Sequence, residues 1–284
     1  MKNQPEIDQI ILNAFNEDIG DGDITSIATV SQDVIGEAKF LVKSDGIIAG
    51  LDIVERVFYL FDPKLQFERK VSDGDKVKSG DIIASVRGIA CSILTTERTA
   101  LNFLQRMSGI ASYANQFAEA VKHTKAKILD TRKTVPGLRI LDKLAVTYGG
   151  CYNHRIGLYD MFLIKDNHIA ASGSITNAVS ACRKFISNSD KNYKIEVEVT
   201  NLEQTKEALG NNADIIMLDN FDTELMKDAV KLINNRALVE ASGGISLETI
   251  KEIAETGVDF ISVGALTHSV KALDISLNLS LILP

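Results

Sequence analysis

The chain has 284 residues, and its 31 Lys and Arg against 38 Asp and Glu give a formal net charge of −7. Hydrophobic residues make up 45% and charged residues 24%, a composition that excludes disordered and collagen-like chains. The acidic balance argues against nucleic-acid binding, because neutralising phosphates needs an excess of basic side chains on at least one face. This length allows either one large barrel or two unequal domains.

The N-terminal sequence and the cysteines predict the cellular location of the protein. The N-terminal sequence lacks the uninterrupted apolar run of a secretory signal, and no run approaches the roughly 20 apolar residues that cross a bilayer. We therefore expect a cytoplasmic protein without a membrane partner. Cys91, Cys151 and Cys182 are far apart and odd in number, which predicts reduced structural thiols rather than disulfides or a zinc site.

The first part of the chain has the pattern of an α+β domain. Residues 7–15 are amphipathic, residues 37–43 resemble a strand, and residues 53–61 have the apolar spacing of a helix. Short strands with Gly turns follow over 71–86, in a pattern that resembles the hairpins of lipoyl- and biotin-carrying domains. A carrier would need a lysine at a hairpin tip in the usual context, and none is present, so we interpret this segment as scaffold.

From residue 126 the chain repeats one unit, a short β-rich run with a polar end followed by a helical or loop stretch. The predicted strands are 126–131, 161–166, 194–199, 214–219, 237–243 and 259–264, and the predicted helices are 201–209, 222–233 and 246–255. Ser246 is a plausible N-cap for the last helix. Alternating strands and helices predict a parallel sheet, and six such units favour a closed or nearly closed barrel. Dinucleotide-binding and P-loop motifs are absent from the sequence.

A cluster of cations lies inside this acidic chain. Residues 128–168 contain six Lys or Arg and four Asp, a local charge of +2. The cations that matter most follow the first predicted barrel strand, end the second or lie in the Gly-rich connection between them: Arg132, Lys133, Lys165, and His154 with Arg155. Strand ends converge on one barrel mouth, so we expect one cavity that binds carboxylates through Arg and phosphates through Lys. A lone basic residue would instead be read as a solvated surface charge.

Two carboxylates face this predicted mouth. One comes from Glu196 or Glu198 in the third strand, where Glu198 is preferred because it lies closer to the polar end, and the other is Asp219. They could hold Mg²⁺, bind ribose hydroxyls or stabilise a developing positive charge. Structural pairing with neighbouring lysines is the alternative.

Glycines end the last two predicted strands, in the sequences 242–244 and 263–265. Gly243, Gly244 and Gly264 let the backbone approach a ligand, and exposed N–H groups bind phosphate oxygens, although tight turns would also explain glycine here. Together these features predict a barrel enzyme whose ligand combines a phosphate, hydroxyls and carboxylates. Transfer of a phosphorylated sugar to or from an acid fits that combination.

Several motifs resemble those of the quinolinate phosphoribosyltransferases, also called carboxylating nicotinate-nucleotide pyrophosphorylases. The similar segments are 17–25, 96–104, 130–139, 149–160, 163–169, 196–199, 217–220, 240–245 and 263–265. The D-T-R-K-T sequence at 130–134 and the N-H-R sequence at 153–155 are highly specific. The resemblance covers nearly the whole chain.

The resemblance implies a fold and a reaction. The fold is an N-terminal α+β open sandwich, here 1–112, followed by an incomplete α/β barrel, here 113–284, with the C-terminal helix able to pack back on the first domain. The reaction transfers phosphoribose from phosphoribosyl pyrophosphate to the quinolinate nitrogen with loss of CO₂, giving nicotinate mononucleotide and pyrophosphate for NAD synthesis. Members work as homodimers in which the partner's N-terminal domain closes each barrel mouth.

The resemblance also implies roles for single residues. The quinolinate pocket falls on Thr131, Arg132, His154, Arg155 and Lys165, with Arg98 from the other subunit. The sugar-phosphate donor falls on Lys133, Lys165, Glu198, Asp219, Ser242, Gly243, Gly244, Gly264 and His268. Lys133, Glu198 and Asp219 are the implied catalytic residues, and Mg²⁺ is the implied cofactor, held by Glu198 and Asp219 directly or through water or pyrophosphate.

Two other functions stay open at this point. One is a homologous phosphoribosyltransferase-like protein of molybdenum utilisation, against which the set of Arg98, Arg132, His154 and Arg155 argues. The other is a non-catalytic barrel that binds or carries a phosphorylated metabolite.

Overall fold

The computed structural model describes residues 3–282, and the chain divides into two compact units. The first unit contains the chain up to Asn115, together with Thr134–Gly150 and the segment from Leu266 onward. The second unit contains Gln116–Lys133 and Cys151–Ala265. The units are therefore interleaved along the sequence rather than consecutive, and each is described by itself.

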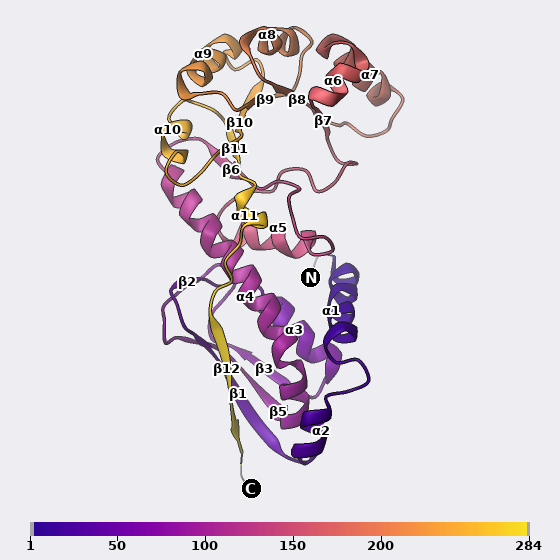
Figure 1. Cartoon of the computed structure of the whole chain (residues 1–284), viewed down its shortest axis with the longest axis vertical. Coiled ribbons are helices and arrows are strands. Elements are labelled where there is room, and N and C mark those ends of the chain that lie inside the picture. The colour runs from indigo at the N-terminus through magenta and orange to yellow at the C-terminus, as the bar shows by residue number, and fades with distance from the viewer. Residues whose placement is uncertain (1–2, 283–284) are drawn as a thin grey trace. The chain divides into compact units, whose positions relative to one another are not determined.

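The first unit is built on a four-stranded antiparallel sheet in the order β12-β1-β5-β3 (Figure 1). These strands are β1 (Ile35–Val42), β3 (Gln66–Arg69), β5 (Ile82–Ile89) and β12 (Ile275–Leu281), and a separate pair is formed by β2 (Gly46–Ile47) and β4 (Lys76–Val77). Alternate residues of β1 are buried, which directs Phe40 into the core. There its ring centroid lies 6.2 Å from that of Phe58 and 6.1 Å from that of Phe67.

Five helices begin in the first unit. They are α1 (Gln4–Asp18), α2 (Ile24–Thr29), α3 (Leu51–Phe61), α4 (Ala90–Val121) and α5 (Arg139–Tyr148). The side chain of Asp23 caps α2 by accepting hydrogen bonds from the backbone N–H groups of Thr25 and Ser26. A bidentate pair joins α4 to α5, because Arg106 Nε and Nη2 donate to the two oxygens of the buried Asp142 at 2.9 and 2.8 Å.

The second unit is a curved, six-stranded parallel sheet in the order β6-β11-β10-β9-β8-β7. The strands are β6 (Lys127–Leu129), β7 (Phe162–Ile164), β8 (Ile195–Val199), β9 (Ile215–Asp219), β10 (Leu238–Ser242) and β11 (Phe260–Ser262). The helices are α6 (Asp166–Ser172), α7 (Ile175–Ser187), α8 (Leu202–Gly210), α9 (Thr223–Ile233) and α10 (Ile250–Ala254), and α11 (Ala265–His268) follows β11. Figure 1 shows α6 to α10 on the outer side of the sheet.

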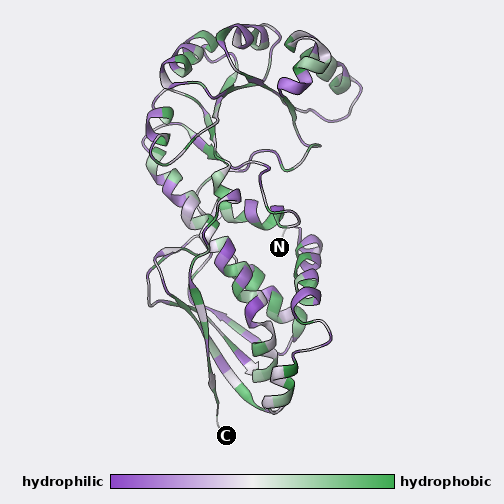
Figure 2. Ribbon diagram, in the orientation of Figure 1, coloured by the Kyte–Doolittle hydropathy of each residue, from purple (hydrophilic) through white to green (hydrophobic). Residues whose placement is uncertain are grey.

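The sequence explains why this sheet forms. Its central strands are almost continuously buried, as expected when helices cover one face and the barrel interior lies on the other. The covering helices are amphipathic, and Figure 2 shows hydrophobic and hydrophilic residues on the same helices. Asn201 and Asp222 cap α8 and α9 through their side chains. The sheet does not close, because β6 and β7 are its two edges.

The predicted fold class, a sandwich followed by an incomplete barrel, is confirmed, and two local predictions are wrong. The C-terminal segment is not a helix but strand β12, which pairs antiparallel with β1 and so belongs to the first sheet. Ser246 is not an N-cap, because α10 begins at Ile250 with Thr249 in the N-cap position. Ser246 instead lies in the preceding turn, where its carbonyl accepts the N–H of Thr249 at 3.2 Å.

Two further observations concern the location and the cysteines. Across residues 3–282, every helix is too short or too polar to cross a bilayer. Cys91, Cys151 and Cys182 are not in disulfides, in agreement with the prediction. Burial raises the pKa of the Cys151 thiol to about 12 and makes it unreactive.

We predict that Gly109→Ala destabilises the protein by about 1–3 kcal/mol, because a Cβ there would lie 2.3 Å from the backbone oxygen of Lys271. Backbone cannot rotate out of the way as a side chain can. Gly210→Ala is the matched control, since a Cβ at that position meets no atom within 4 Å. Urea unfolding of both variants measures the difference, and equal midpoints would show that α4 tolerates a methyl group here.

Candidate active site

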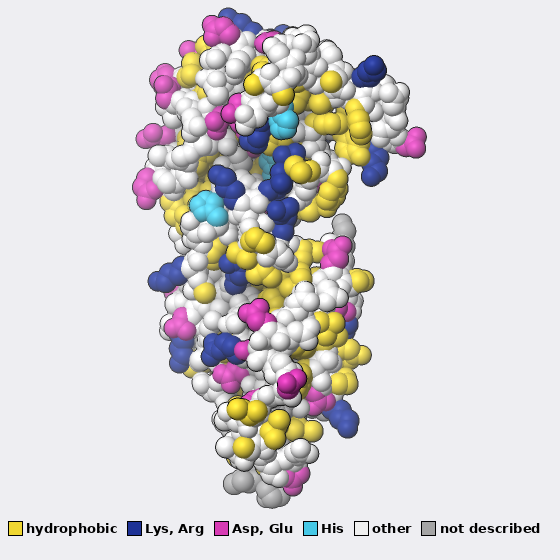
Figure 3. Space-filling view, turned by 45° about the vertical axis from the view of Figure 1, so that its right-hand side comes forward, with side chains coloured by type: hydrophobic (Ala, Val, Ile, Leu, Met, Phe, Trp, Pro, Cys, Tyr) yellow, Lys and Arg dark blue, Asp and Glu magenta, His cyan; other side chains and the backbone are white. Residues whose placement is uncertain are grey.

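Polar side chains gather where the strands of the second unit end. The residues that follow or end β6, β7, β9 and β10 are Thr131 to Lys133, Lys165, Asp219 and Ser242. All six strands are parallel, so these ends lie on one edge of the sheet, as in the mouth of a barrel. Figure 3 shows Lys and Arg side chains gathered around histidines on this part of the molecule. The fold therefore brings the predicted strand-end cations to one edge of the parallel sheet.

Lys165 and Glu198 form an ion pair at this edge. Lys165 is the residue before α6, and its backbone N–H donates to Nδ1 of His168 at 3.0 Å. Glu198 lies on β8 with its side chain 13% exposed, whereas the Lys165 side chain is 42% exposed. Because the Lys165 side chain is half-exposed, its ammonium group can turn from Glu198 toward an anion that enters the site.

The segment 151–160 lies beside the edge strand β6 and carries two of the predicted site residues. Tyr152 forms an isolated parallel bridge with Leu129, in which its N–H donates to the Ile128 oxygen at 2.8 Å. The buried Asp130 accepts the backbone N–H of His154 at 2.9 Å. These contacts give an irregular segment the fixed position of a strand.

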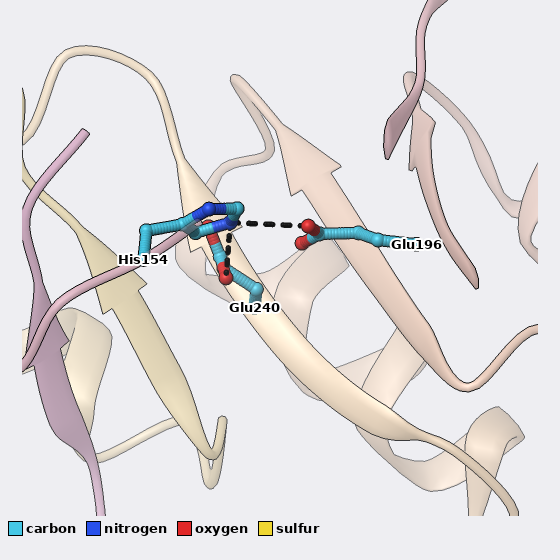
Figure 4. A group of neighbouring side chains, drawn as sticks. All are labelled: His154, Glu196 and Glu240. Atoms are coloured by element: carbon cyan, nitrogen blue, oxygen red, sulfur yellow. Dashed lines mark ion pairs between the residues drawn. The ribbon is translucent and has the colours of Figure 1, made fainter. Parts of the chain in front are cut away.

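His154 points between two buried glutamates, Glu196 on β8 and Glu240 on β10 (Figure 4). Its Nε2 lies 3.0 Å from Glu196 Oε2 and 3.6 Å from Glu240 Oε2. Both glutamate side chains are 0% exposed. Burial raises the pKa of both carboxyl groups, and the nearby Glu196 raises that of Glu240 further. The pair therefore keeps protons at pH values where exposed glutamates have lost theirs.

Arg155 follows His154, and its guanidinium lies within the electrostatic influence of Arg132. Its Nη1 donates to the Met161 oxygen at 3.2 Å. Burial and the charge of Arg132 both lower the pKa of Arg155. Both arginine side chains are half-buried, and their positive charges repel each other. A bound anion would reduce this repulsion, and a molecule with two adjacent carboxylates would suit the site.

Gly243, in the turn that follows β10, lies against the residue that follows β9. Asp219 accepts a hydrogen bond from Asn220 Nδ2 at 2.9 Å. Gly243 has φ +93°, and a Cβ there would lie 2.1 Å from Asn220 Oδ1 and 3.0 Å from Asn220 N. Only glycine allows the two strand ends to approach this closely. The third glycine of the predicted phosphate site, Gly264, follows β11.

Two predicted residues, Arg98 and His268, belong to the first unit. Arg98 lies on α4 with an exposed side chain. His268 ends α11, is exposed, and has its Nδ1 2.7 Å from Ser269 Oγ. The remaining predicted site residues all belong to the second unit.

Four site residues were missed in the sequence analysis: Asp130, Glu196, Glu240 and Asn220. Glu196 was weighed against Glu198 and set aside, yet side-chain alternation places both on one face of β8. Asp130 and Asn220 lie inside motifs that carried the resemblance. Glu240 had the same signal, a charged residue inside a buried strand, where an unpaired carboxylate is costly.

Two groups of residues offer metal ligands. His154, Glu196 and Glu240 present three ligand atoms within 4.8 Å of one another. Glu198 and Asp219 end neighbouring strands, with Glu198 opposite Met217 in the register of β8 and β9. Their carboxylate oxygens are the donors that Mg²⁺ prefers, usually together with substrate phosphates and water. The second group therefore fits Mg²⁺.

Comparisons with known proteins agree with this fold and identify the family. Residues 23–108 match the family model of the quinolinate phosphoribosyl transferase N-terminal domain, and residues 110–278 match that of the C-terminal domain. A chloroplast nicotinate-nucleotide pyrophosphorylase (carboxylating) of Oryza sativa is 46% identical over 96% of this chain and 78% of the rice protein. A probable nicotinate-nucleotide pyrophosphorylase of Bacillus subtilis is 44% identical over 98% of this chain and 95% of its own.

Solved structures give the same result. The crystal structure of NadC from Streptococcus pyogenes has a TM-score of 0.93 at 40% identity and covers 98% of this chain and 97% of its own. The fold defines a protein of two compact units, of which the second is an incomplete α/β barrel with cationic residues at its strand ends. The chain belongs to the quinolinate phosphoribosyltransferase family.

Proposed function

We propose that this protein transfers phosphoribose from phosphoribosyl pyrophosphate to quinolinate, with loss of CO₂, and so forms nicotinate mononucleotide and pyrophosphate for NAD synthesis. Family membership and the names of the relatives support this reaction. The observation that carries it is the placement of Arg132 and Lys165 after strands β6 and β7 at one edge of the parallel sheet, with Arg155 in the segment bridged to β6. Such a set of cations suits an acceptor with two neighbouring carboxylates.

The acceptor site consists of Thr131, Arg132, Arg155 and Lys165 at the mouth of the second unit. The two guanidinium groups each present a fork of N–H donors that matches a carboxylate. Lys165 turns from Glu198 toward the bound dianion. His154 belongs to the same set of acceptor-binding residues.

The donor site consists of residues at the ends of the following strands. Its members are Lys133, Lys165, Glu198, Asp219, Ser242, Gly243, Gly244, Gly264 and His268. Backbone N–H groups at the glycines bind phosphate oxygens, and Lys133 stabilises the pyrophosphate leaving group. Glu198 and Asp219 hold Mg²⁺ directly or through water or pyrophosphate, and the ion, when bound, neutralises charge on the phosphates.

The reaction needs positioning and electrostatics rather than a protein nucleophile. As the bond from ribose C1 to pyrophosphate breaks, positive charge develops on the sugar, and Glu198 or Asp219 stabilises it. The pyridine nitrogen then forms the new bond to C1. Because that nitrogen becomes positively charged, it stabilises the electron pair that departing CO₂ leaves on C2, and C2 then takes up a proton from water. Arg132 and Arg155 hold the acceptor in line during these steps.

We further propose a homodimer in which each site is completed by Arg98 of the partner subunit. Arg98 is exposed on α4, so it is available to another chain. Each unit also exposes large hydrophobic side chains, among them Ile24 and Ile27 in the first and Leu158 and Tyr159 in the second. A dimer interface would remove such side chains from water.

We propose a cytoplasmic location, which cell fractionation would test, since the rice relative is a chloroplast protein and relatives in Nicotiana are mitochondrial. The family assignment argues against both the molybdenum-utilisation homologue and the non-catalytic metabolite-binding barrel.

A turnover assay tests the function directly. Purified protein with quinolinate, phosphoribosyl pyrophosphate and Mg²⁺ is expected to release CO₂ and form nicotinate mononucleotide in equal amounts. Omission of each component in turn is the control, and chelation of Mg²⁺ is expected to abolish turnover. Binding without product at any protein concentration would favour a non-catalytic barrel.

Mixing two inactive variants tests the shared site. Arg98→Ala and Arg132→Ala are each expected to be inactive, whereas a hybrid dimer keeps one intact site. Random exchange in a two-fold dimer is expected to restore about one quarter of wild-type activity. Subunit exchange is verified by native mass spectrometry with one variant isotopically labelled. Full exchange without recovery would contradict the contribution of Arg98 from the partner.

Gly243→Ala is expected to weaken donor use, because the added methyl group displaces Asn220 and with it Asp219. A displacement near 1 Å at a reacting group costs on the order of 100-fold in rate. Gly244→Ala is the matched control, since Gly244 also has positive φ, +61°, but a Cβ there meets no atom within 4 Å. Steady-state kinetics for both substrates compares the variants. Equal losses would mean that backbone strain alone, and not the approach to Asn220, explains the glycine.

A further inference from the structure

The ion pair between Arg106 on α4 and Asp142 on α5 lies in the first unit and holds more than these two helices. The Asp142 side chain is fully buried, and both of its oxygens accept hydrogen bonds from the Arg106 guanidinium. Asp142 Oδ2 also accepts the backbone N–H of Val135 at 3.3 Å. A buried carboxylate needs such donors in place of water, so it fixes the Val135 peptide group as well as the guanidinium.

The segment that Asp142 holds is the connection from β6 to α5, residues 130–138, which carries Lys133. This segment contains neither helix nor strand, so single hydrogen bonds determine its path. Thr134 Oγ1 accepts a hydrogen bond from Arg139 Nε at 3.1 Å, and Asp142 holds the residue after Thr134. Two contacts from α5 therefore fix the chain directly after Lys133, the residue proposed to stabilise the leaving group.

The Arg106 guanidinium also holds helix α11. Its Nη2 donates to the backbone oxygen of the buried Thr267 at 3.4 Å, and the next residue is His268, a member of the proposed donor site. Helix α11 has only four residues, so tertiary contacts rather than its own hydrogen bonds set its position. Gln105, beside Arg106, fixes the chain after α11, because its backbone oxygen accepts the Leu273 N–H at 3.0 Å.

We propose that Arg106 and Asp142 are positioning residues for the sugar-phosphate donor. Their ion pair fixes the segment that carries Lys133 and the helix that ends with His268, two parts of the chain that are far apart in the sequence. Neither member of the pair touches the substrate in this role. The inference rests on the proposed function, in which Lys133 and His268 belong to the donor site.

Arg106→Lys tests the pair, because lysine keeps the charge but loses the two-pronged contact with the carboxylate. The KM for phosphoribosyl pyrophosphate is expected to rise roughly 5- to 30-fold, since its binding groups shift. The KM for quinolinate is expected to change less than about 3-fold, because Arg155 and Lys165 bind it from other segments. Equal rises of the two KM values would overturn the proposal.

Arg56→Lys is the matched control. Arg56 forms the same two-pronged pair in the first unit, with Nε and Nη2 each 2.7 Å from an oxygen of Asp8, but this pair joins α3 to α1. Urea unfolding of both Lys variants measures the stability that each pair provides. Arg56→Lys is expected to leave both KM values unchanged. A rise in its donor KM as large as that of Arg106→Lys would mean that lost stability alone explains the effect.

A double variant tests whether Arg106 and Asp142 act as one unit. Asp142→Asn is expected to raise the donor KM as well, because an amide nitrogen cannot accept the hydrogen bonds that one carboxylate oxygen accepted. The double variant Arg106→Lys with Asp142→Asn is expected to lose no more than the weaker single variant. Additive losses would show two separate roles and would overturn the proposal.

Hydrogen exchange of the ligand-free protein, followed by mass spectrometry, judges the positioning apart from the proposed function. Backbone N–H groups in 134–138 and 265–268 are expected to exchange faster in Arg106→Lys than in the wild type, but not in Arg56→Lys. Unchanged exchange in both segments would overturn the proposal. If the variants of the pair fail to fold, fast exchange throughout 134–138 in the wild type would overturn it. If the wild type neither binds nor converts the two substrates, the proposed function fails, whereas the exchange result still judges the positioning.

Discussion

Two carboxyl groups buried inside a curved parallel sheet set the organisation of this protein. Transferring an ionised carboxylate out of water costs several kcal/mol unless cations or hydrogen-bond donors replace the lost water. Glu196 and Glu240 meet this demand partly through raised pKa values, which keep them protonated at higher pH, and partly through His154 and, for Glu196, the charge of Arg155. The interior thus determines where the segment 151–160 lies, and that segment determines where the cations of the mouth lie.

Much of the fold could be predicted from the sequence because it depends on local patterns. Buried runs with polar ends identified all six strands of the parallel sheet, and parallel strand ends necessarily share one edge. The pairing of β12 with β1 joins the two ends of the chain and leaves no local signal, so the C-terminal segment was misread as a helix. The predicted N-cap at Ser246 was wrong because the residues after it form a turn, so the helix begins later.

The site could be predicted in type but not in connectivity. Residues at strand ends, such as Lys165 and Asp219, followed from topology. The buried residues of the site could not be predicted in this way. A glutamate in a buried strand and a histidine in an irregular segment share no sequence periodicity that would indicate their contact. The contact of His154 with Glu196 and Glu240 depends on the path of the segment between β6 and β7, which only the folded chain reveals.

The β-bridge between Tyr152 and Leu129 also bears on the tendency of the chain to aggregate. An open sheet leaves unpaired N–H and C=O groups along its edge strands, and such edges template pairing with other molecules. Here the segment that presents Arg155 also covers part of the β6 edge. A substitution that loosened this segment would therefore expose the unpaired groups of the β6 edge and also displace Arg155. Selection against aggregation would then preserve the same residues that catalysis requires.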